Sequence, residues 1–114
     1  MTSKIVIRNF EVRKGNTGIT ENEDGIVLDI VGASGYTFHF KTASFSGGPI
    51  TKTTPASITV EGDRVTIPLS LADNAAIAAM GTPISYEIER RKASGAQRSF
   101  MAGNITGLPG LTDD

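Results

Sequence analysis

The alternation of hydrophobic and polar positions is clearest over residues 83–105, where it predicts a complete β-hairpin. Every second residue of the first arm is apolar, so one face is expected in a core and the other in water. Residues 92–96 then supply small side chains and a glycine, which is typical of a hairpin loop. The apolar positions of the first arm are Ile84, Tyr86 and Ile88.

Residues 36–41 form the second clear pattern, with Tyr36, Phe38 and Phe40 on one face. Aromatic side chains bury about 150–250 Å² each, so this face is expected to fill the core. Residues 57–60 and 65–69 predict a second hairpin, joined by a turn at residues 61–64. Pro68 cannot donate a ladder hydrogen bond, which places the end of that strand at a sheet edge.

The remaining strand patterns are weaker. Residues 4–10 alternate with Ile5 and Ile7 on one face, and residues 26–31 are almost continuously apolar, so both are expected to be strands. Residues 42–56 are rich in Ser, Gly, Thr and Pro, and they predict a loop.

Residues 70–80 are the one helical candidate. Ser70 is suited to the N-cap, and Asp73 stands where the carboxylate of a capping box would lie. The apolar residues of this segment do not form one stripe, so a short helix covering one end of the fold is expected.

Together these elements predict an all-β fold: an antiparallel β-sandwich, immunoglobulin-like in size, with about seven short strands and one short helix. Its length of 114 residues favours a single domain over residues 1–114, with residues 106–114 as a flexible tail.

Composition narrows the function classes. The net charge of −1 argues against nucleic-acid binding, which needs a basic excess. The chain has no cysteine, which excludes disulfides and thiol catalysis. It also lacks an apolar run long enough to span a bilayer and the apolar core of a signal peptide, so neither a membrane partner nor export is expected, and synthesis in the cytoplasm is the simplest interpretation.

Candidate catalytic residues are sparse. His39 is the one histidine, and no nucleophile or orienting partner can be assigned to it. The acidic residues 21–24 lack the spacing of a calcium loop, and Glu87 and Glu89 fit a solvated strand face better than a glycosidase pair. We therefore expect no enzyme activity, no catalytic or metal site, no cofactor and no small-molecule substrate.

A basic cluster is the best candidate for a contact with a partner, because it is concentrated at the tip of the predicted hairpin. It could meet phosphate or an acidic protein surface, and the low net charge of the chain favours the protein surface. The cluster consists of Arg90, Arg91, Lys92 and Arg98.

Several short motifs follow one another in an order that resembles a known group. They are Arg13-Lys14-Gly15-Asn16-Thr17, Glu23-Asp24-Gly25, Asp29-Ile30-Val31-Gly32-Ala33, Tyr36-Thr37-Phe38-His39-Phe40-Lys41, the helical segment 70–80, Tyr86-Glu87-Ile88 and Gly103-Asn104-Ile105. This order resembles small β-sandwich virion proteins of tailed bacteriophages, similar to the N-terminal module of baseplate upper proteins and to short tail or head-accessory proteins. In one departure from the group, Leu108-Pro109-Gly110 interrupts the final strand, so the tail is expected to reach toward a neighbour.

The resemblance implies a non-enzymatic structural protein of the virion, made in the host cytoplasm. A tail, baseplate or neck adaptor is expected, packing against other virion proteins and further copies of itself through its edges and through arms at residues 1–3 and 106–114. A capsid decoration protein is the alternative. A carbohydrate-binding β-sandwich is a further alternative that would need Tyr36 as an exposed aromatic platform.

Overall fold

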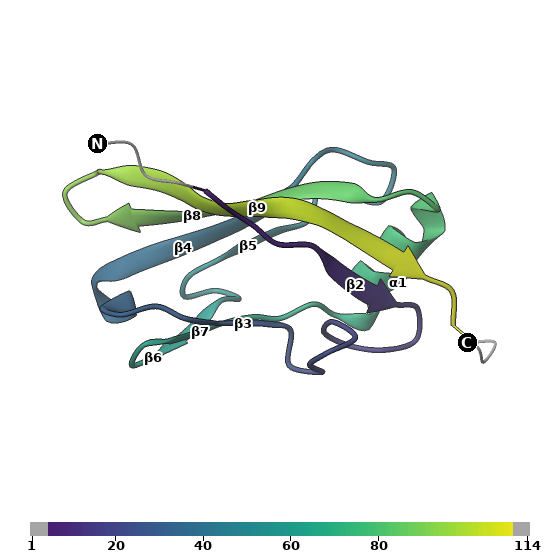
Figure 1. Ribbon diagram of the computed structural model, residues 1–114, viewed down its shortest axis with the longest axis horizontal. Helices are drawn as coiled ribbons and strands as arrows, with labels where there is room; N and C mark the ends of the chain where they lie inside the picture. Colours follow the sequence, from purple (N-terminus) through teal and green to yellow (C-terminus); the bar gives the residue numbers. More distant parts are fainter. Residues whose placement is uncertain (1–4, 111–114) are drawn as a thin grey trace.

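The computed structural model describes residues 5–110, which form two β-sheets packed face to face with a helix at one end (Figure 1). The larger sheet has the order β1-β9-β8-β4-β5, with β2 also paired to β9, and the smaller sheet has the order β3-β7-β6. The molecule is elongated, at 47 × 26 × 20 Å, and the β8–β9 turn lies at the opposite end from the helix.

The elements follow one another along the chain as β1 (Val6–Ile7), β2 (Phe10–Arg13), β3 (Ile26–Asp29), a 3-10 turn η1 (Ala33–Gly35), β4 (Tyr36–Thr42), β5 (Thr51–Thr53), β6 (Thr59–Glu61), β7 (Arg64–Ile67), α1 (Leu71–Met80), β8 (Ile84–Lys92) and β9 (Gln97–Leu108).

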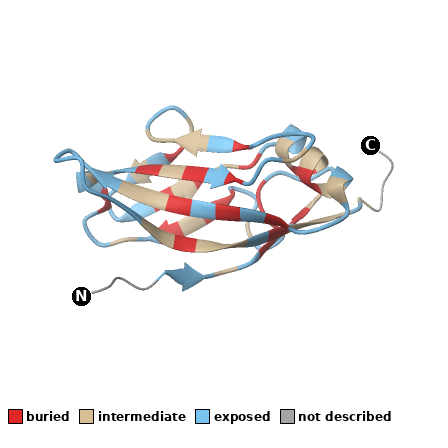
Figure 2. Cartoon of the chain, turned by 90° about the horizontal axis from the view of Figure 1, so that it is seen from above, coloured by how far each residue is buried: buried red, intermediate tan, exposed pale blue. Residues whose placement is uncertain are grey.

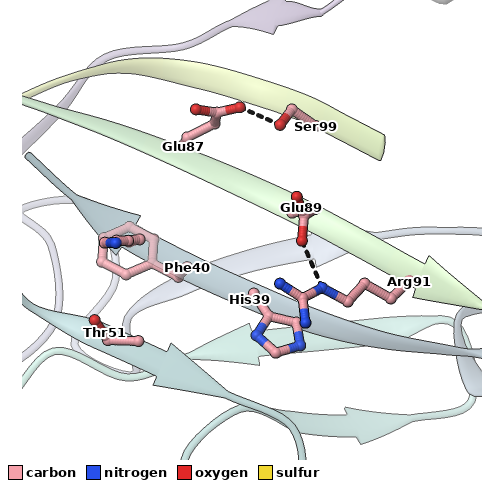
Figure 3. A pocket seen from close by; sticks show the side chains of 8 residues that line it. His39, Phe40, Thr51, Glu87, Glu89, Arg91 and Ser99 are labelled. Carbon is pink, nitrogen blue, oxygen red and sulfur yellow. Dashed lines mark hydrogen bonds and ion pairs between the residues drawn. The ribbon is translucent and has the colours of Figure 1, made fainter. Parts of the chain in front are cut away.

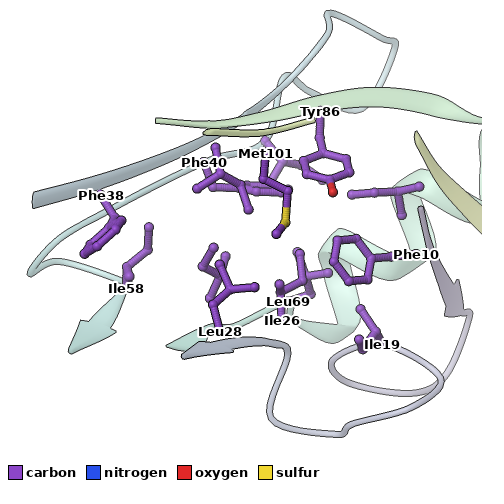
Figure 4. Packing of buried hydrophobic residues seen from close by; sticks show 14 of the residues in the cluster. Phe10, Ile19, Ile26, Leu28, Phe38, Phe40, Ile58, Leu69, Tyr86 and Met101 are labelled. Carbon is purple, nitrogen blue, oxygen red and sulfur yellow. The ribbon is translucent and has the colours of Figure 1, made fainter. Parts of the chain in front are cut away.

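The core lies between the two sheets, and buried residues alternate with exposed ones along the strands (Figure 2). Phe40 and Tyr86 stack at 5.7 Å between ring centroids, and Phe10 contacts Tyr86 at 5.5 Å. Leu28 and Ile58 approach from the side of the smaller sheet (Figure 4). The predicted β-sandwich and the β8–β9 hairpin are therefore confirmed, with the apolar face of β8 in the core.

The predicted helix is also confirmed. The Ser70 side chain accepts a hydrogen bond from the backbone N–H of Asp73 at 3.0 Å, and Asp73 accepts one from the N–H of Ser70 at 2.9 Å. Ile77 is fully buried while Leu71 is 54% exposed, so the helix uses a narrow apolar face. It packs on β9 and β2 and covers one end of the sandwich.

Two predictions about the later half of the chain were wrong. Residues 106–108 are not a flexible tail: they continue β9 and pair with β2. Pro109, which cannot continue a ladder as a donor, follows directly, and its carbonyl accepts a hydrogen bond from Arg13 at 2.9 Å. Pro68 does not mark an edge strand either, since β7 is the central strand of its sheet and ends before the proline.

The two edge regions of the larger sheet also differ from the sequence prediction. Residues 42–56 contain β5, which pairs with β4 although Thr51–Thr53 carries no hydrophobic alternation. The N-terminal strand is divided into β1 and β2, and Ile5, Val6 and Ile7 do not face the core, being 46%, 55% and 70% exposed. The expected arm at residues 1–3 and the end of the tail at 111–114 lie outside the described residues.

The first strands run parallel to β9, which the sequence did not predict. Phe10 is paired with Ile105, so the β2–β9 pairing joins segments that are far apart in the sequence. Between β1 and β2, the Arg8 N–H donates to the Ala102 carbonyl at 3.0 Å, and the Asn9 side chain accepts from the Asn104 N–H at 2.9 Å. These two contacts bridge the gap between β1 and β2.

Tyr86 also holds the segment between β1 and β2, by a hydrogen bond from the core side of the sheet. Its hydroxyl donates to the Arg8 carbonyl, passing the paired residue Gly103, which has no side chain in the way. Burial raises the pKa of Tyr86 to about 12, although the Arg8 guanidinium acts to lower it. Tyr86 therefore stays a neutral donor throughout the physiological pH range.

We expect Gly107→Ala to destabilise the fold by about 1–3 kcal/mol, because there is no room for a methyl group where α1 lies on β9. A Cβ at this position would lie 2.4 Å from the Ala78 Cα and 2.5 Å from its backbone N, and backbone cannot move aside cheaply. Urea unfolding monitored by circular dichroism measures the change.

Gly35→Ala is the matched control, because a Cβ there meets nothing within 4 Å. Its free energy of unfolding should change by less than about 1 kcal/mol. Equal losses in the two variants would show that the close approach of α1 and β9 is not what position 107 requires.

Candidate functional site

The four basic residues predicted as a partner contact do not all lie together. Alternation along β8 puts Arg90 and Lys92 on the inner face and Arg91 on the outer face of the larger sheet. Arg98 is paired with Arg90 across the hairpin and lines the same inner pocket. Three of the four therefore converge, and Arg91 belongs to a separate site.

The inner group forms a small pocket at the hairpin tip, which we call the tip pocket. It encloses about 240 Å³ and is lined by Tyr36, Arg90, Lys92, Ala96 and Arg98. Its lining residues lie toward the turn of the β8–β9 hairpin. This end of the hairpin extends past the smaller sheet (Figure 1).

Aromatic rings contact two of the cations of the tip pocket. The Arg90 guanidinium carbon lies 5.1 Å from the centre of the Tyr36 ring and 5.9 Å from that of Phe100. The Lys92 ammonium lies 5.9 Å from the Tyr36 ring. Such cation–π contacts are worth about 0.5–1 kcal/mol each at exposed sites, so they favour one arrangement of these long side chains.

A β-bulge in β9 places the second aromatic ring that contacts Arg90. Ile88 is paired with Met101 but Glu89 with Ser99, so Phe100 is the extra residue. Phe100 packs edge-on against Phe38 at 6.1 Å, on the inner face next to Met101. The bulge thereby directs Phe100 toward the core side and changes which face the following residues take.

The outer face carries a row of polar side chains (Figure 3). His39 is paired with Glu89 on β8, and Glu89 is paired with Ser99 on β9. Arg91 Nε lies 2.6 Å from Glu89 Oε1, and the Ser99 hydroxyl donates to Glu87. These residues surround an open hollow of about 280 Å³.

This row does not have the geometry of a serine hydrolase. β8 separates His39 from Ser99, and two strand spacings place them about 10 Å apart. A general base must lie within hydrogen-bond reach of its nucleophile. The hydroxyl of Ser99 is instead engaged with Glu87, so the row is best described as cross-strand pairing of polar and charged groups.

His39 lies on the outer face, opposite the aromatic face of β4, as the alternation predicted. Partial burial lowers its pKa below 6.5, and the Arg91 guanidinium lowers it further, while Glu89 acts in the opposite direction. His39 is therefore mainly neutral at pH 7.

The acidic segment at residues 21–24 lies in a tight turn. Ile19 and Asn22 form an isolated bridge, and the Asn22 side chain accepts from the Asp24 N–H at 2.9 Å. Within residues 5–110, no group of three or more His, Asp or Glu side chains is placed to hold a metal ion. The same part of the chain contains no helix that is long and apolar enough to cross a membrane.

Sequence reasoning found the cations but not their aromatic contacts. The sequence predicts Tyr36 in the core; it is half-buried and packs against the core, and it also stands opposite Lys92 in the β4–β8 ladder. Phe100 does not line the pocket, but the bulge brings its ring into contact with Arg90. Neither the register of two distant strands nor the position of a bulge is encoded in the hydrophobic alternation of one strand.

Comparisons with known proteins do not extend these observations. A scan against protein-family models finds no match to the chain, and a search of curated proteins finds no relative either. The resemblance to tailed-phage virion proteins therefore stays a prediction based on the order of motifs.

The lowered pKa of His39 predicts a small loss of stability on mild acidification. The unfolded chain takes up a proton near pH 6.5, the ordinary value, whereas the folded protein takes it up only at lower pH. The free energy of unfolding should therefore fall as the pH drops from about 7.5 to about 5.5. Urea midpoints across this range give the slope.

His39→Gln should flatten that slope, because glutamine is polar and does not titrate. Asp73 titrates below this window: burial raises its pKa, but hydrogen bonds from Lys52 and Ser70 lower it by more, to below its ordinary value. A slope unchanged by His39→Gln would show that another group produces it.

Proposed function

We propose that the protein is a non-enzymatic structural component of a tailed-phage virion, a tail, baseplate or neck adaptor that packs against other virion proteins and further copies of itself. The phage assignment rests on the motif order given above. The contact role is supported chiefly by one observation, the exposed apolar edge formed by Ile5, Val6 and Ile7.

The strand β1 is the edge of the larger sheet at which a partner can best add a strand. No strand within residues 5–110 pairs with its outer side, and its side chains are apolar. An edge of this kind offers free backbone donors and acceptors to an incoming strand.

The opposite edge of the sheet is less open to pairing. Pro49 and Pro55, which carry no N–H, stand on either side of β5, whose own residues Thr51–Thr53 are polar. Prolines beside an edge strand are a common way of preventing unwanted edge pairing. The difference between the two edges supports β1 as the contact edge.

Two alternative functions are a capsid decoration protein and a carbohydrate-binding module. A capsid decoration protein would use the same contacts at another place on the particle. A carbohydrate-binding module would need a free face of Tyr36, but Arg90 and Lys92 lie over that ring. The cations therefore weigh against sugar stacking at Tyr36.

We expect the protein to be present in purified particles, where electron microscopy of a labelled copy would place it at the tail or baseplate or on the capsid. Ile7→Lys should reduce its incorporation, because a charge at the β1 edge disfavours strand addition and apolar contact. Val31→Lys is the matched control, since Val31 is 90% exposed and lies away from this edge.

The two variants distinguish the edge from the general effect of an added charge. Circular dichroism should show both folded, since both positions are exposed. Equal incorporation of the two would exclude the β1 edge, and absence of the wild-type protein from purified particles would exclude the virion role.

A further inference from the structure

The tip pocket brings like charges together in a way that does not help the fold. Arg90 and Arg98 stand directly opposite each other across the β8–β9 hairpin, and like charges in this position are destabilising. Lys92 adds a third positive charge to the same pocket. Such departures from the local rules of sheet pairing are expected mainly where a site has a function.

Among the described residues, two other basic side chains form ion pairs with carboxylates. Lys52 lies 2.8 Å from Asp73, and Arg91 lies 2.6 Å from Glu89. For Arg90 and Lys92, by contrast, no carboxylate of residues 5–110 lies within ion-pair distance, and both side chains contact aromatic rings instead. Aromatic faces orient a cation without neutralising it, so Arg90 and Lys92 keep their positive charge.

The pocket is also arranged before any ligand arrives. Arg90 is held between two rings, and the turn that carries Lys92 is closed by hydrogen bonds from its N–H to the Ala96 carbonyl at 2.8 Å and from the Gly95 N–H to its carbonyl at 2.9 Å. A guanidinium that is already oriented loses little side-chain entropy when it binds a carboxylate or a phosphate.

We propose that the tip pocket binds the carboxylate of an Asp or Glu side chain presented by an acidic segment of a partner protein. The proposal stands on the pocket alone and does not require the virion role. A carboxylate matches the forked donors of arginine, and a volume of about 240 Å³ suits one small anionic group with its immediate neighbours.

The surroundings favour an isolated anionic group over a polyanion. Nucleic acids are bound along extended basic grooves, whereas the basic residues here form one pocket in a chain of net charge −1. The adjoining outer face of the hairpin also carries Glu87 and Glu89, which would repel a long phosphate backbone. A single acidic side chain on a protein surface meets neither obstacle.

The test is an NMR titration of the isotope-labelled full chain with a capped Gly-Glu-Gly peptide and with its neutral counterpart, capped Gly-Gln-Gly. The glutamate peptide should give saturable shifts confined to the Arg90 side chain and to the amides of Ala96 and Gln97, and the glutamine peptide should not. The double variant Arg90→Gln/Lys92→Gln should weaken binding by roughly fivefold or more.

Arg91→Gln is the matched control: it removes the neighbouring charge from the opposite face of the same strand and should leave the affinity unchanged. Lys92→Gln alone serves as a second variant if the double variant does not fold, because Lys92 is exposed. Even this single change should weaken binding of the glutamate peptide.

Three results would overturn the proposal. The first is equal shifts with both peptides, or none with either. The second is a loss in Arg91→Gln as large as in the double variant, which would indicate only a general effect of surface charge. The third is binding of inorganic phosphate or of a short oligonucleotide roughly tenfold tighter than that of the glutamate peptide, which would assign the pocket to phosphate groups.

Discussion

The parallel pairing of the first strands with β9 is the constraint on which the larger sheet depends. β9 pairs with β8 along one edge and with β1 and β2 along the other, while α1 packs across its far end. Glycine is needed where this strand is approached most closely. At Gly103 a Cβ would lie 2.1 Å from the Arg8 carbonyl oxygen, and at Gly107 it would meet the backbone of α1. The Tyr86 side chain passes over Gly103, and its hydroxyl donates a hydrogen bond to the Arg8 carbonyl.

The two ends of the hairpin consequently have different roles. Toward α1, β9 is enclosed by other elements, and Ile105 on its inner face is fully buried. Toward the turn, the bulge at Phe100 shifts the alternation, and the inner face passes from apolar side chains to cations set against aromatic rings. One strand thus contributes to the core at one end and to a charged pocket at the other. The three cations of the proposed site lie on β8 and β9 and not in the turn between them, which favours a fixed geometry.

Sequence reasoning succeeded where local signals were strong. The alternation in β8 and β4 and the Ser70–Asp73 capping box identified the sandwich and its helix, because side-chain periodicity and capping act over a few residues. It failed where pairing partners are distant. Nothing in Phe10–Arg13 indicates a parallel partner at Ile105, and nothing in Thr51–Thr53 indicates a strand, since an edge strand buries little. The clustering of basic residues in the sequence identified the cations of the tip pocket. Their separation from Arg91 is seen only when the inward–outward alternation of β8 is continued as far as Lys92.

The closure of β2 on β9 also has a kinetic consequence. Beside this pairing, the Asn9 side chain accepts a hydrogen bond from the Asn104 N–H, and the two residues are 95 positions apart along the chain. Contacts between such distant segments form only after most of the loop-closure entropy has been lost, so topologies of this kind fold slowly. The β8–β9 hairpin can form early from neighbouring residues, but until β2 docks, the outer edge of β9 is open to pairing with other chains. During synthesis β2 emerges long before its partner strand β9. The β2–β9 pairing is therefore the contact at which a nascent chain is most exposed to misassembly.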